Sequence, residues 1–211
     1  MYGLRRRLAA AGYSLANAAF GLADMSDALG GSRPSPSAAH VTGSAAVRAT
    51  RTADLTSFAR ARVWLAMARA FRWRTHWAAF HWYVTAQVDG RTAAVAGIVD
   101  RQGAVGFTPA RSGLLGGVVT ASRYRRNGLG AAIVRRSTEL IARELRCDFG
   151  VLICSPDLVP FYRRLGWKQV PNPLVYVRFG ERGEHTGPVM VYEPGDRSLP
   201  PGPIDVKGLP V

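Results

Sequence analysis

The 211-residue sequence contains only two cysteines, Cys147 and Cys154. One lies at the end of a predicted helix and the other within a predicted strand, so we expect a buried, reduced pair rather than a disulfide framework. The two cysteines and four histidines show no metal-ligand spacing, and no metal site is predicted. No apolar run reaches the length that crosses a bilayer, so no membrane partner is expected.

Acidic side chains are also scarce: 14 stand against 28 lysines and arginines, which gives a formal net charge of +14. Such a surplus suits an anionic ligand, and it equally suits RNA or an acidic protein. No aromatic-basic nucleic-acid motif accompanies the charge, so a nucleic-acid partner is not favoured. Five of the acids lie after Val177: Glu181, Glu184, Glu193, Asp196 and Asp205.

The two best-known phosphate-binding loops are absent. There is neither a G-x-x-x-x-G-K-[ST] loop nor a G-x-G-x-x-G fingerprint with an acidic residue about 20 positions later. What is present is Tyr-Arg-Arg-Asn-Gly-Leu-Gly at 124–130. It lies between an apolar run at 114–120 and an amphipathic stretch at 129–145, which predict a strand and a helix.

This turn has the properties of an anion site. The first N–H groups of a helix lack partners within the helix and carry the positive end of its dipole, so they bind phosphate well. Gly128 and Gly130 allow a ligand to approach the backbone, and Arg123, Arg125 and Arg126 add positive charge. We expect a pyrophosphate here.

A second motif follows an apolar run at 149–154, which predicts a buried strand. It reads Ser-Pro-Asp-Leu-Val-Pro-Phe-Tyr-Arg-Arg-Leu-Gly-Trp from Ser155 to Trp167. Together with R-x-x-G-x-G at 125–130, it resembles the two signature motifs of the GNAT superfamily of N-acyltransferases, in the same order and at the usual separation.

The resemblance implies a GNAT-like α/β fold: a mixed, mostly antiparallel sheet with two splayed parallel central strands, at 114–120 and 149–154, and helices on both faces. It implies acetyl-CoA as the acyl donor, with its pantetheine arm bonded to the first strand, and therefore a cytoplasmic location. The implied cofactor-binding residues are Val118, Val119, Thr120, Arg125, Arg126, Asn127, Gly128, Leu129, Gly130 and Ser155.

Tyr162 matches the position of the general acid that such enzymes use. An unperturbed phenol has a pKa of about 10, so it remains protonated at neutral pH and can donate to a departing thiolate. The general base is less evident, because Gly116 falls near the position where some relatives carry a glutamate. The pair Gly116–Gly117 predicts a bulge or a close approach of substrate or cofactor. A carboxylate from elsewhere, or water, must then take the proton.

The stretches 187–194 and 201–208 resemble the C-terminal ends of aminoglycoside 2′-N-acetyltransferases and of nodulation-factor acyltransferases. Both groups modify amino sugars, so the resemblance implies a small amine acceptor, held by Glu193 and Asp205. Covering a sheet edge is the alternative role of such a tail. A longer-chain N-acyltransferase, and a catalytically weak CoA-binding or protein-interaction module, remain alternatives. The sequence leaves open whether the protein forms a homodimer.

Composition divides the chain into a flexible or loosely helical extension at 1–45 and a domain at 46–211. A helix is predicted from Asp54, with Phe58, Ala61, Leu65, Met67 and Ala68 on its buried face. Extended runs at 82–88, 92–99, 105–108, 175–179 and 189–193 predict strands. Turns are predicted at Asp89-Gly90 and at Gln102-Gly103.

Overall fold

The computed structural model describes residues 45–211 except 58, 62, 64–66 and 68–77, so the predicted extension at 1–45 lies outside the described residues apart from Ala45. The strands are β1 (Ala46–Arg51), β2 (Trp82–Val88), β3 (Arg91–Val105), β4 (Thr108–Thr120), β5 (Phe149–Ile153), β6 (Lys168–Val170), β7 (Leu174–Arg178), β8 (Glu181–His185), β9 (Val189–Tyr192) and β10 (Ile204–Asp205). The helical elements are η2 (Thr52–Asp54), η3 (Ser122–Tyr124), α3 (Leu129–Glu139), the π-helical turn η4 (Leu140–Glu144), η5 (Pro156–Leu158) and α4 (Val159–Arg163).

The strands form one curled mixed sheet in the order β6-β9-β5-β4-β3-β10-β7-β8, with β2 also paired to β3 and β1 to β2. Two pairs, β4–β5 and β10–β7, are parallel, and the others are antiparallel. The predicted α/β class, mostly antiparallel sheet and parallel central pair are therefore confirmed.

β3 and β4 form a long hairpin whose turn lies at Gly106-Phe107, so the predicted turn at Gln102-Gly103 is wrong. Gly103 lies inside β3, opposite Ala110. A Cβ there would come within 2.3 Å of the Asp205 carbonyl oxygen of β10. This glycine therefore permits a close approach of two backbones rather than a turn. The predicted Asp89-Gly90 turn does join β2 to β3.

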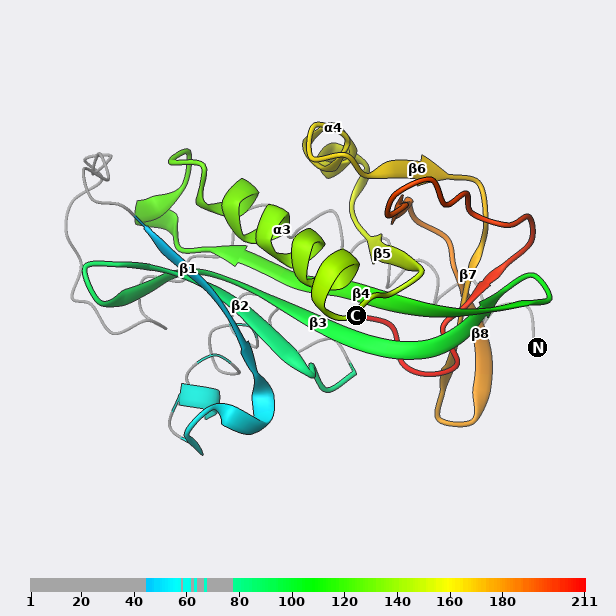
Figure 1. The fold of residues 1–211 in the computed structure, drawn as a ribbon, viewed down its shortest axis with the longest axis horizontal. Coiled ribbons are helices and arrows are strands. Elements are labelled where there is room, and N and C mark those ends of the chain that lie inside the picture. Colours follow the sequence, from blue (N-terminus) through cyan, green and yellow to red (C-terminus); the bar gives the residue numbers. More distant parts are fainter. Residues whose placement is uncertain (1–44, 58, 62, 64–66, 68–77) are drawn as a thin grey trace, which may run out of the picture.

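α3 lies across β1 to β4 on one face of the sheet (Figure 1). Ile133 and Val134 of α3 are fully buried, and Ile141 of the π-helical turn packs where a Cβ at Gly113 would lie, at 2.6 Å. The predicted helix at 129–145 is thus confirmed, with a π-helical end.

The helix predicted from Asp54 starts later than expected, because Asp54 ends η2 and residues 55–56 are not helical. Residues 57, 59–61, 63 and 67 are helical, and the other positions up to 77 lie outside the described residues. Val63 and Met67 are buried there, whereas Ala61 is exposed, so its predicted place on the buried face is wrong. Phe58, Leu65 and Ala68 lie outside the described residues.

Candidate functional site

A gap opens between β4 and β5. The two strands pair only from Ser112 to Leu114 of β4, opposite Phe149 to Val151 of β5. β4 continues to Thr120, whereas β5 ends at Ile153, so residues 115–120 of β4 form no ladder with β5. Backbone N–H and C=O groups at such an edge can bond to an extended ligand that carries amides. Val118, Val119 and Thr120 lie in this stretch.

A bulge bends β4 within the gap. The register with β3 shifts between Val95 and Gly97, and Gly117 opposite has a φ of 60°. The predicted bulge at the glycine pair is therefore present. The close approach at Gly116, however, is made by the chain itself: a Cβ there would lie 2.8 Å from the Cβ of Val211.

The arginine-rich turn leads from β4 and η3 into α3. Arg126 and Gly128 have left-handed backbones, with φ of 64° and 74°. No atom of the described residues lies within 4 Å of where a Cβ at Gly128 would stand, and the first turn of α3 contains no acidic side chain. The positive end of the helix dipole therefore has no carboxylate in its own first turn, which fits an anion such as a pyrophosphate.

The two sequence motifs meet beside this turn. Arg125 donates through Nε to the Thr120 carbonyl at 3.3 Å. A Cβ at Gly130 would lie 3.4 Å from the Thr120 hydroxyl and 3.9 Å from the Phe161 ring of α4. Asn127 is half-buried in the turn and Leu129 is buried as the first residue of α3. Ser155 is the residue that precedes η5 after β5, and its side chain forms no capping bond to that turn.

Tyr162 lies in α4, one residue after Phe161, and is 5 % exposed. Its ring packs edge-on against Phe161 at 5.0 Å and against Trp167 at 6.5 Å. Burial, with a smaller contribution from Cys154, raises the pKa of the Tyr162 phenol well above its ordinary value. The hydroxyl is therefore protonated at neutral pH and is able to donate, but not to accept a proton as a base.

The predicted acceptor ligands are both engaged by other groups of the chain. Glu193 Oε2 contacts Lys168 Nζ at 2.5 Å and its Oε1 accepts the Leu199 N–H at 2.8 Å, and these bonds lower the pKa of Glu193. Asp205 Oδ2 pairs with Arg182 at 3.1 Å, and its Oδ1 accepts the Lys207 N–H at 2.9 Å. An acceptor role for either stays a prediction.

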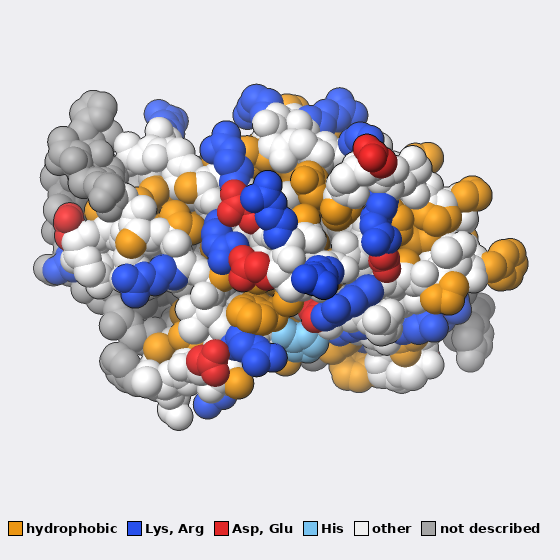
Figure 2. Space-filling view, in the orientation of Figure 1, with side chains coloured by type: hydrophobic (Ala, Val, Ile, Leu, Met, Phe, Trp, Pro, Cys, Tyr) orange, Lys and Arg blue, Asp and Glu red, His pale blue; other side chains and the backbone are white. Residues whose placement is uncertain are grey.

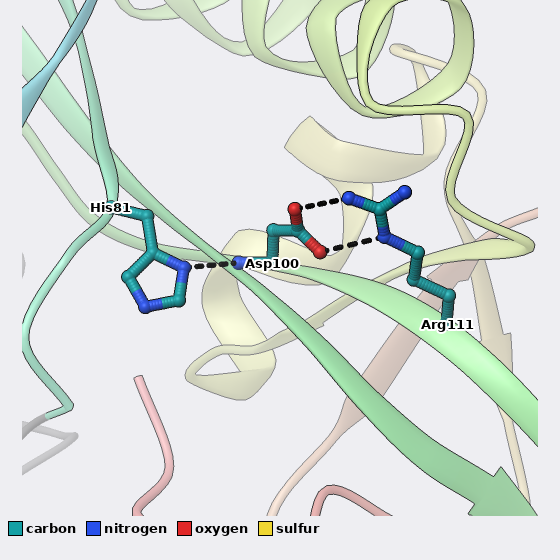
Figure 3. A network of polar contacts seen from close by, with 3 residues as sticks. All are labelled: His81, Asp100 and Arg111. Carbon is teal, nitrogen blue, oxygen red and sulfur yellow. Dashed lines mark hydrogen bonds and ion pairs between the residues drawn. The ribbon is translucent and has the colours of Figure 1, made fainter.

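A polar network fixes the start of the parallel pair (Figure 3). Arg111 of β4 contacts both carboxylate oxygens of Asp100, and the Asp100 N–H donates to His81 Nδ1 at 3.3 Å. The Arg111 N–H also donates to Asp148 Oδ2 at 2.8 Å, and Asp148 pairs with Arg197. The end of the gap at Leu114 is thereby held in place.

Sequence reasoning missed an apolar cavity at the closed end of the gap. Its walls come from β4, β5, β7 and the chain after β10: Leu114, Val151, Leu152, Ile153, Leu174, Val206, Pro210 and Val211. The only available signal was the apolar Leu-Pro-Val ending, which carries no motif. In the described part of the chain no cluster of metal-ligating side chains occurs, and no helix is long and apolar enough to cross a membrane.

Residues 48–167 match the model of the acetyltransferase (GNAT) family, and this chain belongs to that family. No curated protein matches it. Similar solved structures include ElaA of Escherichia coli, with 13 % identity, a TM-score of 0.55 and coverage of 71 % of this chain and 100 % of that one.

Two further structures resemble the fold. An acyl-CoA N-acyltransferase from Pseudomonas aeruginosa has 19 % identity and a TM-score of 0.52, and the match covers 71 % of this chain and 99 % of that one. The GNAT family N-acetyltransferase YhbS of Escherichia coli, solved in complex with CoA, has 15 % identity and a TM-score of 0.51, with coverage of 77 % and 89 %. The predicted superfamily is confirmed; the finer likeness to amino-sugar enzymes stays a prediction.

Proposed function

We propose that the protein transfers an acetyl group from acetyl-CoA to a primary amine. The observation that carries this proposal is the open backbone edge of β4 leading to the N-terminus of α3, whose first turn holds no acidic side chain, with Tyr162 in α4 on the segment that follows β5. The pyrophosphate binds at the turn 125–130. The pantetheine amides then bond to the backbone at Val118 and Val119, in the manner of an added strand.

The reaction is a direct transfer. The nitrogen of the neutral amine attacks the thioester carbonyl, the C–N bond forms, and the C–S bond breaks as the tetrahedral intermediate collapses. Tyr162 gives its phenolic proton to the departing sulfur, so CoA leaves as the thiol. The amine nitrogen loses one proton to water, from which the phenol is reprotonated. Water is assigned this role because the cavity beside the site is lined by apolar residues.

The acceptor is a small amine, and the resemblance of the tail to amino-sugar acyltransferases favours an amino sugar. The alternative is a module that binds CoA without turnover. Thiol release from acetyl-CoA, measured with a panel of amines that includes aminoglycosides and glucosamine, separates the two. An enzyme releases thiol at a rate that rises with the concentration of at least one amine, whereas a binding module releases no thiol with any of them.

Cofactor placement is tested by Gly128→Val and thermal unfolding with CoA. A ligand that binds only the folded state raises Tm, and a valine side chain would fill the space proposed for the pyrophosphate. We expect the CoA-induced rise in Tm to be lost. Gly180→Val is the matched control, because Gly180 also has a positive φ, 80°, and no neighbour within 4 Å of its Cβ position. An equal CoA-induced rise in both variants would remove the turn from the site.

A further inference from the structure

The segment after β10, residues 206–211, is bonded through its backbone to two parts of the molecule, β7 and the loop before β2. The Val206 N–H donates to the Val175 carbonyl of β7 at 3.0 Å, and the Val177 N–H donates to the Gly208 carbonyl at 3.1 Å. The Ala78 N–H donates to the Pro210 carbonyl at 3.2 Å. We call residues 206–211 the tail segment. Its bonds hold it at a defined place across the sheet.

Arg101 of β3 provides a further attachment. Its NH1 donates to the carbonyls of Val206 at 3.2 Å and Leu209 at 3.0 Å. Among the described residues it forms no ion pair, and partial burial lowers the pKa of its guanidinium. A Cβ at Gly208 would lie 2.6 Å from NH1, so a larger residue there would displace the guanidinium from the tail segment.

These attachments bring the end of the tail segment to the gap between β4 and β5. Pro210 and Val211 line the apolar cavity opposite Leu114 and Val151, the last residues of the parallel ladder. Val211 lies against Gly116, within the open stretch of β4. On the β5 side the cavity ends at Ile153, and the next residue, Cys154, is close enough to Tyr162 to affect the pKa of its phenol.

The direction of the donor places its acyl end in this cavity. The proposed pyrophosphate site follows the end of β4, so the pantetheine arm runs back along the strand from Thr120 toward Leu114. Six residues of strand span about 20 Å. The sulfur then lies beside Tyr162, and the acyl carbon chain points toward the closed end of the gap, where the walls are apolar and the tail segment blocks further extension.

We propose that the tail segment closes the acyl pocket, that Val211 limits the acyl chain to two carbons because the cavity of about 10 Å³ holds about one methyl-sized group, and that Arg101 positions this wall. The proposal rests on the proposed acyltransferase function. It predicts that the protein uses short-chain acyl-CoA donors. It also makes the tail segment, which carries no sequence motif, a determinant of specificity for the acyl chain. Arg101 touches neither donor nor acceptor and acts only through the tail segment.

The test compares kcat/KM for acetyl-, propionyl-, butyryl- and hexanoyl-CoA in the wild type and in Val211→Ala. One methylene in an apolar pocket is worth roughly 10- to 200-fold in kcat/KM. We expect the wild type to prefer acetyl-CoA over butyryl-CoA by at least tenfold, and Val211→Ala to reduce that preference about tenfold. Val47→Ala, a valine of β1 at the edge of the sheet, is the control and should leave the chain-length profile unchanged.

Three further variants keep the test decisive. Ile153→Val widens the same cavity from β5 and should shift the profile toward propionyl- and butyryl-CoA even if Val211→Ala unfolds. Arg101→Met keeps the bulk of the side chain but removes both bonds to the tail segment, so it should broaden the profile with little change in kcat for acetyl-CoA. Arg101→Lys should restore part of the wild-type profile.

The outcomes separate this inference from the proposed function. One outcome is thiol release with acetyl-CoA and the same chain-length profile in the wild type, Val211→Ala and Ile153→Val. This result overturns the role of the tail segment but leaves the proposed acyltransferase function in place. Equal use of butyryl- and acetyl-CoA by the wild type overturns it as well. If no acyl-CoA releases thiol with any amine, both the role of the tail segment and the proposed acyltransferase function are overturned.

Discussion

Burial determines which proton transfers are open to Tyr162. The side chain is 5 % exposed, and removal of the phenolate from water raises its pKa above the ordinary value of 10. The phenol therefore carries its proton across the whole physiological range. The phenol can therefore always donate a hydrogen bond to a thiolate formed beside it, while the same burial disfavours the phenolate, so the proton lost to sulfur must be replaced from water.

The Tyr162→Phe variant should lower kcat by about 10²-fold or more, with CoA affinity almost unchanged, because general acids contribute roughly 10²- to 10⁴-fold. Tyr192→Phe is the control, since Tyr192 also packs on Trp167, at 5.9 Å between ring centroids. Steady-state kinetics with acetyl-CoA and the best amine measure both. Wild-type kcat in Tyr162→Phe would transfer the acid role to water.

His185 gives the stability of the protein a pH dependence. Burial lowers its pKa from 6.5 to about 4, so the folded state binds fewer protons than the unfolded state between these values. The contribution of His185 to the free energy of unfolding is therefore fully present above pH 6.5. It is lost as the pH drops toward 4, by up to about 1.4 kcal/mol per pH unit. Urea unfolding at pH 7 and pH 5 should show this loss, and a smaller loss in His185→Gln. An equal loss in that variant would assign the slope to other groups.

Single glycines show where reading a sequence succeeds and fails. The open backbone at Gly128 was predictable, because a glycine that precedes a helix and lies beside arginines is typical of an anion-binding turn. The residue does adopt a left-handed backbone. Gly103 and Gly116 were not: each makes room for a segment about 100 residues later, Asp205 and Val211. Nothing local in the sequence distinguishes such a glycine from one in a turn.

At the scale of elements, α3 is fixed to the second motif by a buried bond. Trp167 Nε1 donates to the Thr138 hydroxyl at 3.2 Å, and that hydroxyl donates to the Val134 carbonyl at 2.9 Å. Trp167 is 1 % exposed. The helix that begins at Leu129 is thereby tied to the residues that follow Tyr162.

The Thr138→Val variant keeps the shape of the side chain but leaves the indole N–H without an acceptor, so it should lower the free energy of unfolding by about 1–3 kcal/mol. The neighbouring Ser137→Ala is the matched control: its buried hydroxyl has no hydrogen-bond partner among the described residues, and its removal should cost little. Urea denaturation measures both. A loss in Thr138→Val no larger than in Ser137→Ala would show that this bond does not stabilise the fold.

The elements that carry strong local patterns were predictable: β2, β5, β7, β9 and the helix at α3. The misplaced β3–β4 turn and the unpredicted β10 have one cause, because β10 is a two-residue strand that exists through its partners on β3 and β7. The parallel pair followed from the family resemblance, and its length of three residue pairs came only from the structure.

For the whole molecule, the net charge of +14 predicts a salt dependence. Lysine and arginine side chains are spread over the face that includes α3 (Figure 2). Because screening weakens attraction of an anionic donor, KM for acetyl-CoA should rise several-fold between about 50 and 500 mM salt, with kcat almost unchanged. S-acetyl-N-acetylcysteamine, a thioester without phosphates, serves as the control substrate. An equal rise in KM for this neutral donor would argue against a role for the charge.

β3 is bonded to three other strands of the sheet. It pairs with β2 along its first half, with β4 along most of its length, and with β10 at its end. Because β3 is bonded on both sides along much of its length, its paired amides should exchange with solvent deuterium only when the entire domain unfolds. The tail segment is held by fewer bonds, so its amides should exchange faster. Hydrogen exchange should therefore distinguish a slowly exchanging centre from the proposed wall of the acyl pocket.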